Sequence, residues 1–91
     1  MQRVDLSIVI PALDEEKSIS ELHLLITKSL DKKKINYEII FVDDGSKDQT
    51  LNKVISLNKK NPDIVKYFRH DLNKGQSYAI LTGIKNANYD T

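Results

Sequence analysis

Hydrophobic residues gather in two short runs that have little polar interruption. Leu6–Ile10 and Tyr37–Val42 are rich in β-branched or aromatic side chains, as is typical of strands buried on both faces of a parallel sheet. Pro11 closes the first run, because proline has no N–H to donate to a sheet ladder. A third run, Ile64–Arg69, alternates more and carries two basic residues, which predicts a partly exposed strand at a sheet edge.

Three other segments space their apolar residues as amphipathic helices do. The inward positions are expected to be Ile19, Leu22, Leu25, Ile26 and Leu30 in the first, Leu51, Val54, Ile55 and Leu57 in the second, and Ala79, Ile80, Gly83, Ile84 and Ala87 in the third. Small residues in the third segment predict a helix that lies close to the sheet. Ser18 with Glu21, and Ser46 with Gln49, have capping-box spacing, which predicts a helix start at each serine.

The order strand-helix, repeated three times, predicts an α/β fold with a parallel sheet. Right-handed crossovers place the first two helices on one face and the third on the other, giving three layers. The third strand is expected at one edge and the first strand inside the sheet. The turns Pro11–Glu16 and Asp43–Ser46 then share the rim at the carboxyl ends of the strands, where α/β sheets bind ligands. Residues 1–91 are interpreted as one small domain or part of a larger one.

Composition excludes several classes of function. Fourteen basic and thirteen acidic residues give a net charge of +1, which offers no electrostatic basis for binding nucleic acid. The chain has no cysteine, so disulfides and thiolate metal sites are excluded. The absence of cysteine fits a protein of the cytosol. Its apolar runs are far shorter than the ~18 residues of a membrane span.

The rim carries paired carboxylates, Asp43 and Asp44, followed by Gly45, which suits a sharp turn. The first turn lacks the glycines that let a backbone approach a diphosphate, and carries Asp14-Glu15-Glu16 instead. A nucleotide would therefore present its base and ribose here, where an ionised Asp can accept from N–H groups of uracil or guanine. From the residues alone, a helix-capping role for Asp43 and Asp44 is an equal alternative.

Three stretches resemble glycosyltransferase family 2, the inverting enzymes with the GT-A fold: Ser7–Glu16, Ile40–Thr50 and Asn73–Ala87. Together they cover nearly the whole chain in the right order. Among members, the polyprenyl-phosphate transferases of dolichyl-phosphate mannose type are the most similar. The resemblance implies a Rossmann-like, three-layer nucleotide-binding half of a GT-A domain, with the sheet incomplete in this chain.

The resemblance also implies roles for individual residues. Pro11, Leu13 and Glu15 would line the pocket of a UDP- or GDP-sugar, Asp44 would hold the base, and Asp43 would support the turn. The acceptor would be a compound such as a polyprenyl phosphate, in the cytoplasm or at the cytoplasmic face of the membrane. The Asp-x-Asp ligands for Mg²⁺ or Mn²⁺ and the catalytic base are expected after Thr91, so the chain alone should be inactive.

The sequence departs from the family pattern at three places. Members often have Asn at the Asp14 position and an aromatic residue at Leu13, so stacking on the base is expected to be weaker here. They usually have Gly-Asp where Tyr89-Asp90 stands.

Two other functions stay open at this point. A receiver-like signalling domain would use the same acidic strand end for Mg²⁺, with Asp71 as a poor phosphate acceptor, and a non-catalytic nucleotide-binding module is the second. His70 and Asp71 are interpreted as solvated loop residues, and His23 as a surface or half-buried helix residue. Without a neighbour, the apolar strand Leu6–Ile10 should self-associate.

Overall fold

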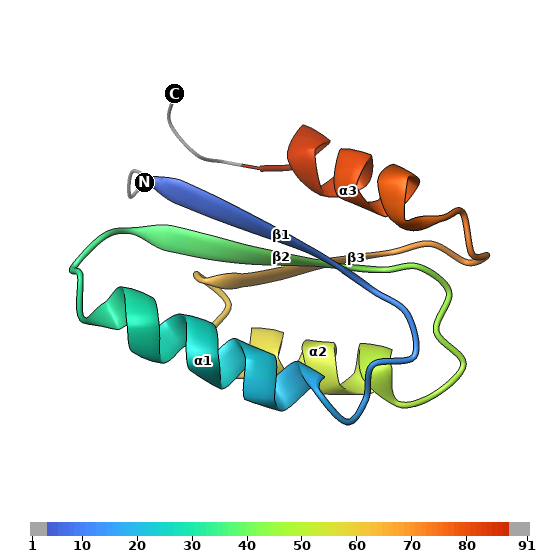
Figure 1. Ribbon diagram of the computed structural model, residues 1–91, viewed down its shortest axis with the longest axis horizontal. Helices are drawn as coiled ribbons and strands as arrows, with labels where there is room; N and C mark the ends of the chain where they lie inside the picture. Colours follow the sequence, from blue (N-terminus) through green and yellow to red (C-terminus); the bar gives the residue numbers. More distant parts are fainter. Residues whose placement is uncertain (1–3, 88–91) are drawn as a thin grey trace.

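Six elements alternate along residues 4–87, the part of the chain that the computed structural model describes. They are β1 (Leu6–Ala12), α1 (Ile19–Asp31), β2 (Tyr37–Asp43), α2 (Thr50–Lys60), β3 (Val65–Arg69) and α3 (Gln76–Lys85) (Figure 1). The predicted α/β fold with three strand-helix units is confirmed. The helix α2 ends at Lys60, directly before Asn61 and Pro62.

The three strands form a parallel sheet in the order β1-β2-β3. Every residue of the central strand β2 is buried, which explains its almost continuous apolar sequence. The strand β3 lies at an edge, as predicted. The expectation that the first strand lies inside the sheet is not met within residues 4–87, where β1 forms the other edge.

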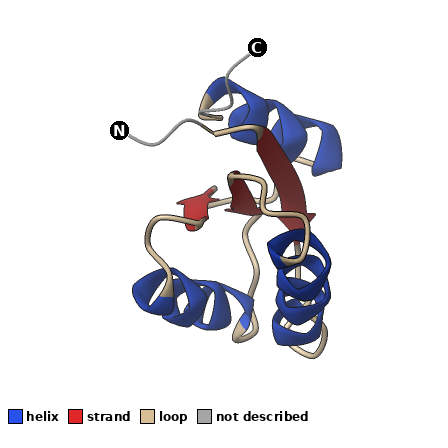
Figure 2. Ribbon diagram, turned by 90° about the vertical axis from the view of Figure 1, so that its left-hand side faces the viewer, coloured by secondary structure: helices blue, strands red, loops and turns tan. Residues whose placement is uncertain are grey.

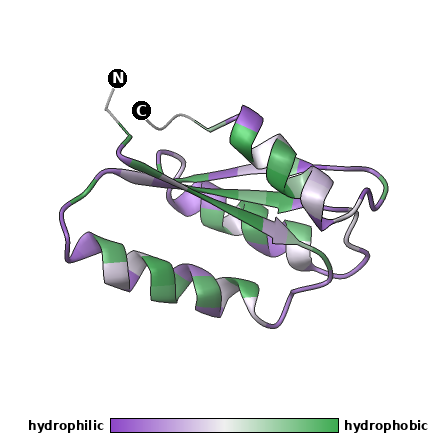
Figure 3. Cartoon of the chain, turned by 45° about the horizontal axis from the view of Figure 1, so that its top comes forward, coloured by the Kyte–Doolittle hydropathy of each residue, from purple (hydrophilic) through white to green (hydrophobic). Residues whose placement is uncertain are grey.

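Helices cover the sheet on both faces and give the expected three layers (Figures 1 and 2). On the face that α1 and α2 cover (Figure 1), Ile39 and Phe41 of β2 pack with Ile19 and Val54. Because side chains alternate along a strand, Ile40 and Val42 of β2 point to the other face, where they pack with Ala79 of α3. The strands are mostly hydrophobic in Figure 3, and the helices show alternating hydrophobic and hydrophilic bands.

The helix α3 approaches the sheet closely, as its small residues predict. Ala79 and Gly83 are its buried positions, and a Cβ added to Gly83 would overlap the side chain of Val9 on β1. The prediction that Ile80 and Ile84 face inward is wrong, since these side chains are 36% and 52% exposed. The helix touches the sheet along the stripe of small residues, which leaves the isoleucines to one side.

The first helix also has less of its apolar surface buried than its spacing predicts. Ile19 is buried, but Leu22 and Leu25 are 37% and 60% exposed. An apolar groove of about 300 Å³ runs between β1 and α1 and is lined by Leu6, Ile8, Leu25, Ile26, Ser29 and Leu30. This side of α1 therefore lies beside the β1 edge of the sheet, where no further strand of residues 4–87 covers it.

The two predicted capping boxes do not form. Ser18 precedes α1 but makes no capping hydrogen bond, because its hydroxyl donates to Glu15. The second helix begins at Thr50 rather than at Ser46. The Ser46 hydroxyl accepts a hydrogen bond from Asp14 of the first turn instead, so a contact between distant segments replaces the local cap. None of the described helices is long and apolar enough to cross a membrane.

Candidate functional site

A pocket of about 430 Å³ lies where the carboxyl ends of β1 and β2 meet the start of α3. It is lined by Pro11, Ala12, Leu13, Glu15, Asp44, Asn73, Gly75 and Gln76. Four of the five residues expected to bind a nucleotide are among these, namely Pro11, Leu13, Glu15 and Asp44. The position matches the rim at which open α/β sheets bind their ligands.

Side chains of the second turn hold the backbone of the first turn. Asp14, in the left-handed region with φ of 52°, donates its N–H to the Ser46 hydroxyl at 2.9 Å. The Asp14 carboxylate in turn accepts from the N–H of Lys47 at 2.8 Å. Leu13 and Glu15, on either side of Asp14, are thereby fixed in position along one wall of the pocket.

Asp48 and Thr50 form a second clamp on the same loop. The Thr50 hydroxyl accepts from the N–H of Glu15 at 2.7 Å, and Asp48 accepts from the N–H of Glu16 at 3.3 Å. Asp48 also accepts from the N–H and hydroxyl of Thr50. Burial would raise the pKa of the Asp48 carboxyl, but these hydrogen bonds outweigh it and hold the pKa below its usual value. Sequence reasoning missed this clamp, which joins segments more than thirty residues apart.

The two adjacent carboxylates, Asp43 and Asp44, serve different sides of the sheet. Asp43 is the last residue of β2 and is buried, and its carboxylate accepts from the N–H of Ser46 at 3.2 Å. It does not line the pocket. The backbone at Gly45 then turns with φ of 84°, and a Cβ there would lie 2.9 Å from the backbone nitrogen of Asn73. Only glycine fits this turn without strain.

Asp44 stands at the floor of the pocket with its carboxylate almost fully engaged. One oxygen, Oδ1, contacts Nδ1 of His70 and accepts from the N–H of Lys74, both at 2.9 Å, and Oδ2 accepts from the N–H of Gly75 at 2.8 Å. Burial of this residue, only 3% exposed, would raise the pKa of its carboxyl. The hydrogen bonds from His70, Lys74 and Gly75 outweigh that effect, so the pKa lies below its usual value and Asp44 is ionised.

The interpretation of His70 as a solvated loop residue is wrong. His70 follows β3 directly, is only 9% exposed, and donates its backbone N–H to the carbonyl of Asp43 at 2.8 Å. Its ring contacts Asp44 through Nδ1 and the Thr82 hydroxyl through Nε2, each at 2.9 Å. The strand register carried the signal, because β3 pairs Arg69 with Asp43 and so brings the next two residues together.

The described residues do not provide a metal site. No group of three or more His, Asp or Glu side chains comes together within residues 4–87, so this part of the chain does not fit the Mg²⁺ or Mn²⁺ that the family resemblance implies. Asp71 is 91% exposed and pairs with Arg69 at 3.7 Å, away from Asp43 and Asp44. The acidic cluster of a receiver domain is therefore absent from the described residues. His23 is half-buried, as expected.

Comparison with known proteins identifies the family. The model of glycosyl transferase family 2 matches residues 7–91. This chain belongs to glycosyl transferase family 2. Its expected departure at Tyr89-Asp90 lies outside the described residues.

Relatives are found among lipid-linked sugar transferases. The chain is 39% identical over 84 residues to the dolichol-phosphate mannosyltransferase of Pyrococcus furiosus. This match covers 92% of the present chain and 23% of that protein. It is 32% identical over 90 residues to the dolichyl-phosphate beta-glucosyltransferase of Dictyostelium discoideum, covering 92% and 28% respectively. The chain thus spans about a quarter of the length of these family 2 relatives.

A solved structure shows the same fold. The mannosyltransferase of Pyrobaculum calidifontis, determined in complex with GDP-Man and Mn²⁺, superposes with a TM-score of 0.75 at 22% identity. The match covers 96% of this chain and 25% of the other. The expected Rossmann-like half of a GT-A domain is confirmed.

Proposed function

We propose that this chain forms the donor-nucleotide site of a family 2 glycosyltransferase, with the base and ribose of a UDP- or GDP-sugar in the rim pocket. The observation that carries the proposal is the pocket itself. It lies at the carboxyl ends of parallel strands, and an ionised carboxylate that donors on three sides hold in place forms its floor. Family membership of residues 7–91 supports the same assignment.

The unused acceptor capacity of Asp44 suits the edge of a base. An ionised carboxylate has about four lone-pair positions, and the three donors from His70, Lys74 and Gly75 leave one of them free. The N3–H of uracil or the N1–H of guanine fits that remaining acceptor. Pro11 and Leu13 offer apolar surface beside it, while the Glu15 carboxylate suits ribose hydroxyls and disfavours a diphosphate.

The activity of the whole protein would be sugar transfer to an acceptor such as a polyprenyl phosphate. The names of the relatives from Pyrococcus furiosus and Dictyostelium discoideum support a lipid-phosphate acceptor. With such an acceptor, the reaction would take place at the cytoplasmic face of a membrane. A divalent cation, Mg²⁺ or Mn²⁺, would offset the charge of the diphosphate, and its ligands are expected after Thr91.

Calorimetry with matched carboxylate variants tests the base site. In the whole protein that contains this chain, Asp44→Asn should weaken the binding of UDP or GDP by about tenfold or more, since a charge-assisted bond contributes roughly 1.5–3 kcal/mol. Asp71→Asn removes the same charge from a side chain that is 91% exposed and outside the pocket. This control should bind like the wild type.

Two results would count against the proposal. If the wild-type protein binds neither UDP nor GDP, the pocket is not a nucleotide site. If Asp44→Asn binds both as tightly as the wild type, Asp44 has no part in holding the base.

A further inference from the structure

A line of polar contacts, buried at Asp44 and partly buried at Thr82, runs from the pocket floor into α3. It begins at Asp44, passes through both nitrogens of the His70 ring and ends at the hydroxyl of Thr82, with each contact at 2.9 Å. His70 is thus the only described residue that contacts both the Asp44 carboxylate and the second turn of α3. The proposed function counts His70 only as one of three donors to Asp44 and does not use its connection to α3.

We propose that His70 is a positioning residue for the nucleotide, which sets the orientation of Asp44 and ties it to α3. The inference rests on the proposed function of the pocket. His70 does not line the pocket, so it acts on a ligand only through Asp44. Its role is to direct the one free acceptor position of that carboxylate toward the base.

The chemistry of the partners requires a proton on Nδ1 of the His70 ring. The Asp44 carboxylate is ionised and can only accept, so Nδ1 of His70 must donate to it. In the neutral ring Nε2 is then an acceptor, and the Thr82 hydroxyl must donate to it. With this Nδ1–H tautomer, both ring nitrogens and the hydroxyl are satisfied.

The same carboxylate sets the position of the opposite wall of the pocket. Asp44 accepts from the N–H groups of Lys74 and Gly75, and Gly75 lines the pocket. Without its bond from His70, Asp44 could rotate, and the backbone at Lys74 and Gly75 would lose its fixed acceptors. One substitution at His70 should therefore affect the floor and the wall together.

The contact between His70 and Asp44 is buried, since these residues are only 9% and 3% exposed. The rings of Tyr78 and His70 meet in an edge-to-face arrangement, with centroids 5.2 Å apart and planes at 73°. The Lys74 ammonium lies 5.0 Å from the centroid of the Tyr78 ring. Shielding from water strengthens the bond between His70 and Asp44, because competing donors are excluded.

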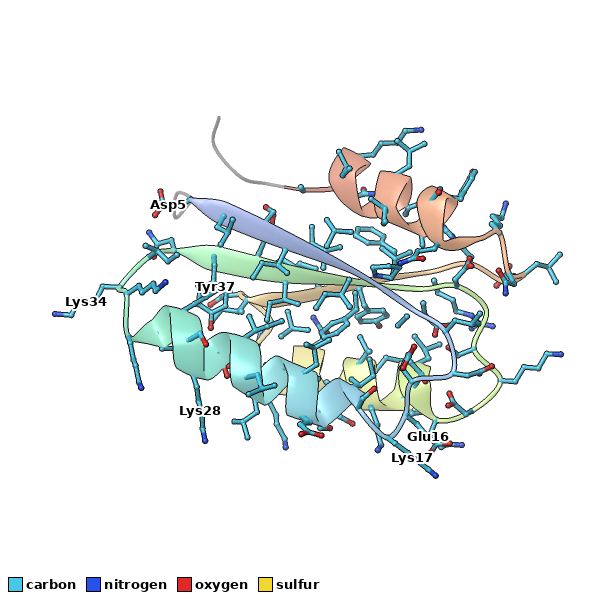
Figure 4. All side chains as sticks on the ribbon, viewed as in Figure 1. Asp5, Glu16, Lys17, Lys28, Lys34 and Tyr37 are labelled. Atoms are coloured by element: carbon cyan, nitrogen blue, oxygen red, sulfur yellow. The ribbon has the colours of Figure 1, made fainter. Side chains whose placement is uncertain are left out.

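Four variants of the whole protein separate positioning from simple stabilisation. His70→Leu removes the donor to Asp44 and should weaken UDP or GDP binding by about tenfold, the effect of one lost charge-assisted bond. His70→Asn keeps an N–H donor near the place of Nδ1 and should restore most of that affinity. Thr82→Val removes only the far contact and should have the smaller effect. Tyr37→Phe is the stability control, since Tyr37 lies at the opposite end of the sheet (Figure 4).

A double variant gives the readout that a purely structural role would not change. If His70 acts through Asp44, then His70→Leu should cause no further loss of affinity in the Asp44→Asn background. Nitrogen-15 NMR of the His70 ring should show the Nδ1–H tautomer in the wild-type protein and in Asp71→Asn.

The outcomes distinguish this inference from the proposed function. Absence of UDP and GDP binding in the wild type would overturn both. Normal binding by the wild type together with equal affinity in His70→Leu would overturn the positioning role alone. So would additive losses in the double variant, or an Nε2–H tautomer in the NMR spectrum.

Discussion

The contact between Gly83 and Val9 gives the sharpest test of how α3 is seated on the sheet. A methyl group added by Gly83→Ala would overlap Cγ1 of Val9 and lie 3.1 Å from Cγ2 and 3.2 Å from Cβ. A valine in a strand has few alternative rotamers, and the Cβ contact would persist in any of them. The helix must therefore shift away from β1 to accept the new group.

Two opposing terms decide the size of the effect. Replacing glycine by alanine in a helix interior favours folding by about 1 kcal/mol, whereas overpacking a well-filled contact costs about 1–3 kcal/mol. Because the new methyl would meet three atoms of a stiff side chain at short range, we expect the cost at the upper end. The net loss in the free energy of unfolding should be about 1–2 kcal/mol.

The assay is urea unfolding of the 91-residue chain at low micromolar concentration, followed by circular dichroism. Val9→Ala alone should cost about 1–1.5 kcal/mol for two half-buried methyl groups. The double variant should be more stable than the sum of the two losses predicts, by about 1–2 kcal/mol, because the alanine then occupies the vacated space. If Gly83→Ala raised stability and the effects of the two substitutions were additive, α3 would not lie in close contact with Val9.

Four further predictions concern other parts of the chain. Asp48→Asn should lower stability more than it changes UDP or GDP affinity, since Asp48 holds the backbone at Glu16 and Thr50 and does not line the pocket. Unfolding and calorimetry on the same variant measure the two effects. A large loss of affinity with unchanged stability would instead make Asp48 a ligand-binding residue. The 91-residue chain, incubated with UDP- and GDP-sugars, Mn²⁺ and a polyprenyl phosphate, should form no product, because the described residues contain no metal cluster, and metal-dependent turnover would contradict this. Burial and the hydrogen bond to Asp31 raise the pKa of Tyr37 from 10.0 to about 12. Between these pH values the folded state keeps a proton that the unfolded chain releases, so the free energy of unfolding should fall as pH rises from 10 to 12. Unfolding curves of Tyr37→Phe at alkaline pH should not show this fall. The chain should self-associate through β1, and Ile8→Lys should reduce association in sedimentation experiments while lowering fold stability, whereas a clean wild-type monomer at high concentration would refute the idea.

The order of the elements could be predicted from the sequence because periodicity reports burial directly. The run Tyr37–Val42 is apolar except for Glu38 because β2 is covered on both faces. The smaller residues of α3 mark the side of the helix that contacts the sheet. The start of the first helix at Ser18 is confirmed, but the start of the second helix could not be predicted in the same way. Ser46 has the spacing of a cap, but its hydroxyl is used by Asp14, 32 residues away, and local spacing contains no information about such a partner.

In the candidate site, too, some features could be predicted from the sequence and others depend on contacts between distant segments. Pro11, Leu13, Glu15 and Asp44 were named from a family resemblance, and the structure brings them to one pocket. His70 was missed because a lone histidine after an edge strand is usually solvated, and only the register of β3 against β2 reveals that it faces Asp44. The different directions of Asp43 and Asp44 follow from strand alternation, although their adjacency in the sequence suggests a pair.

Some residues around the pocket hold the backbone and others only line its surface, and this difference indicates which positions can vary without destabilising the fold. Asp44, Asp48 and Thr50 are engaged in hydrogen bonds that join distant segments, so substituting any of them would change the scaffold and the site together. Leu13 and Gln76, by contrast, are exposed side chains on backbone that other residues hold in place. A change there alters the surface offered to a ligand and leaves the clamps intact. Under the proposed function, selectivity between nucleotides should therefore depend on these exposed positions. Affinity for a base of either kind should depend on the buried carboxylate and the groups that orient it.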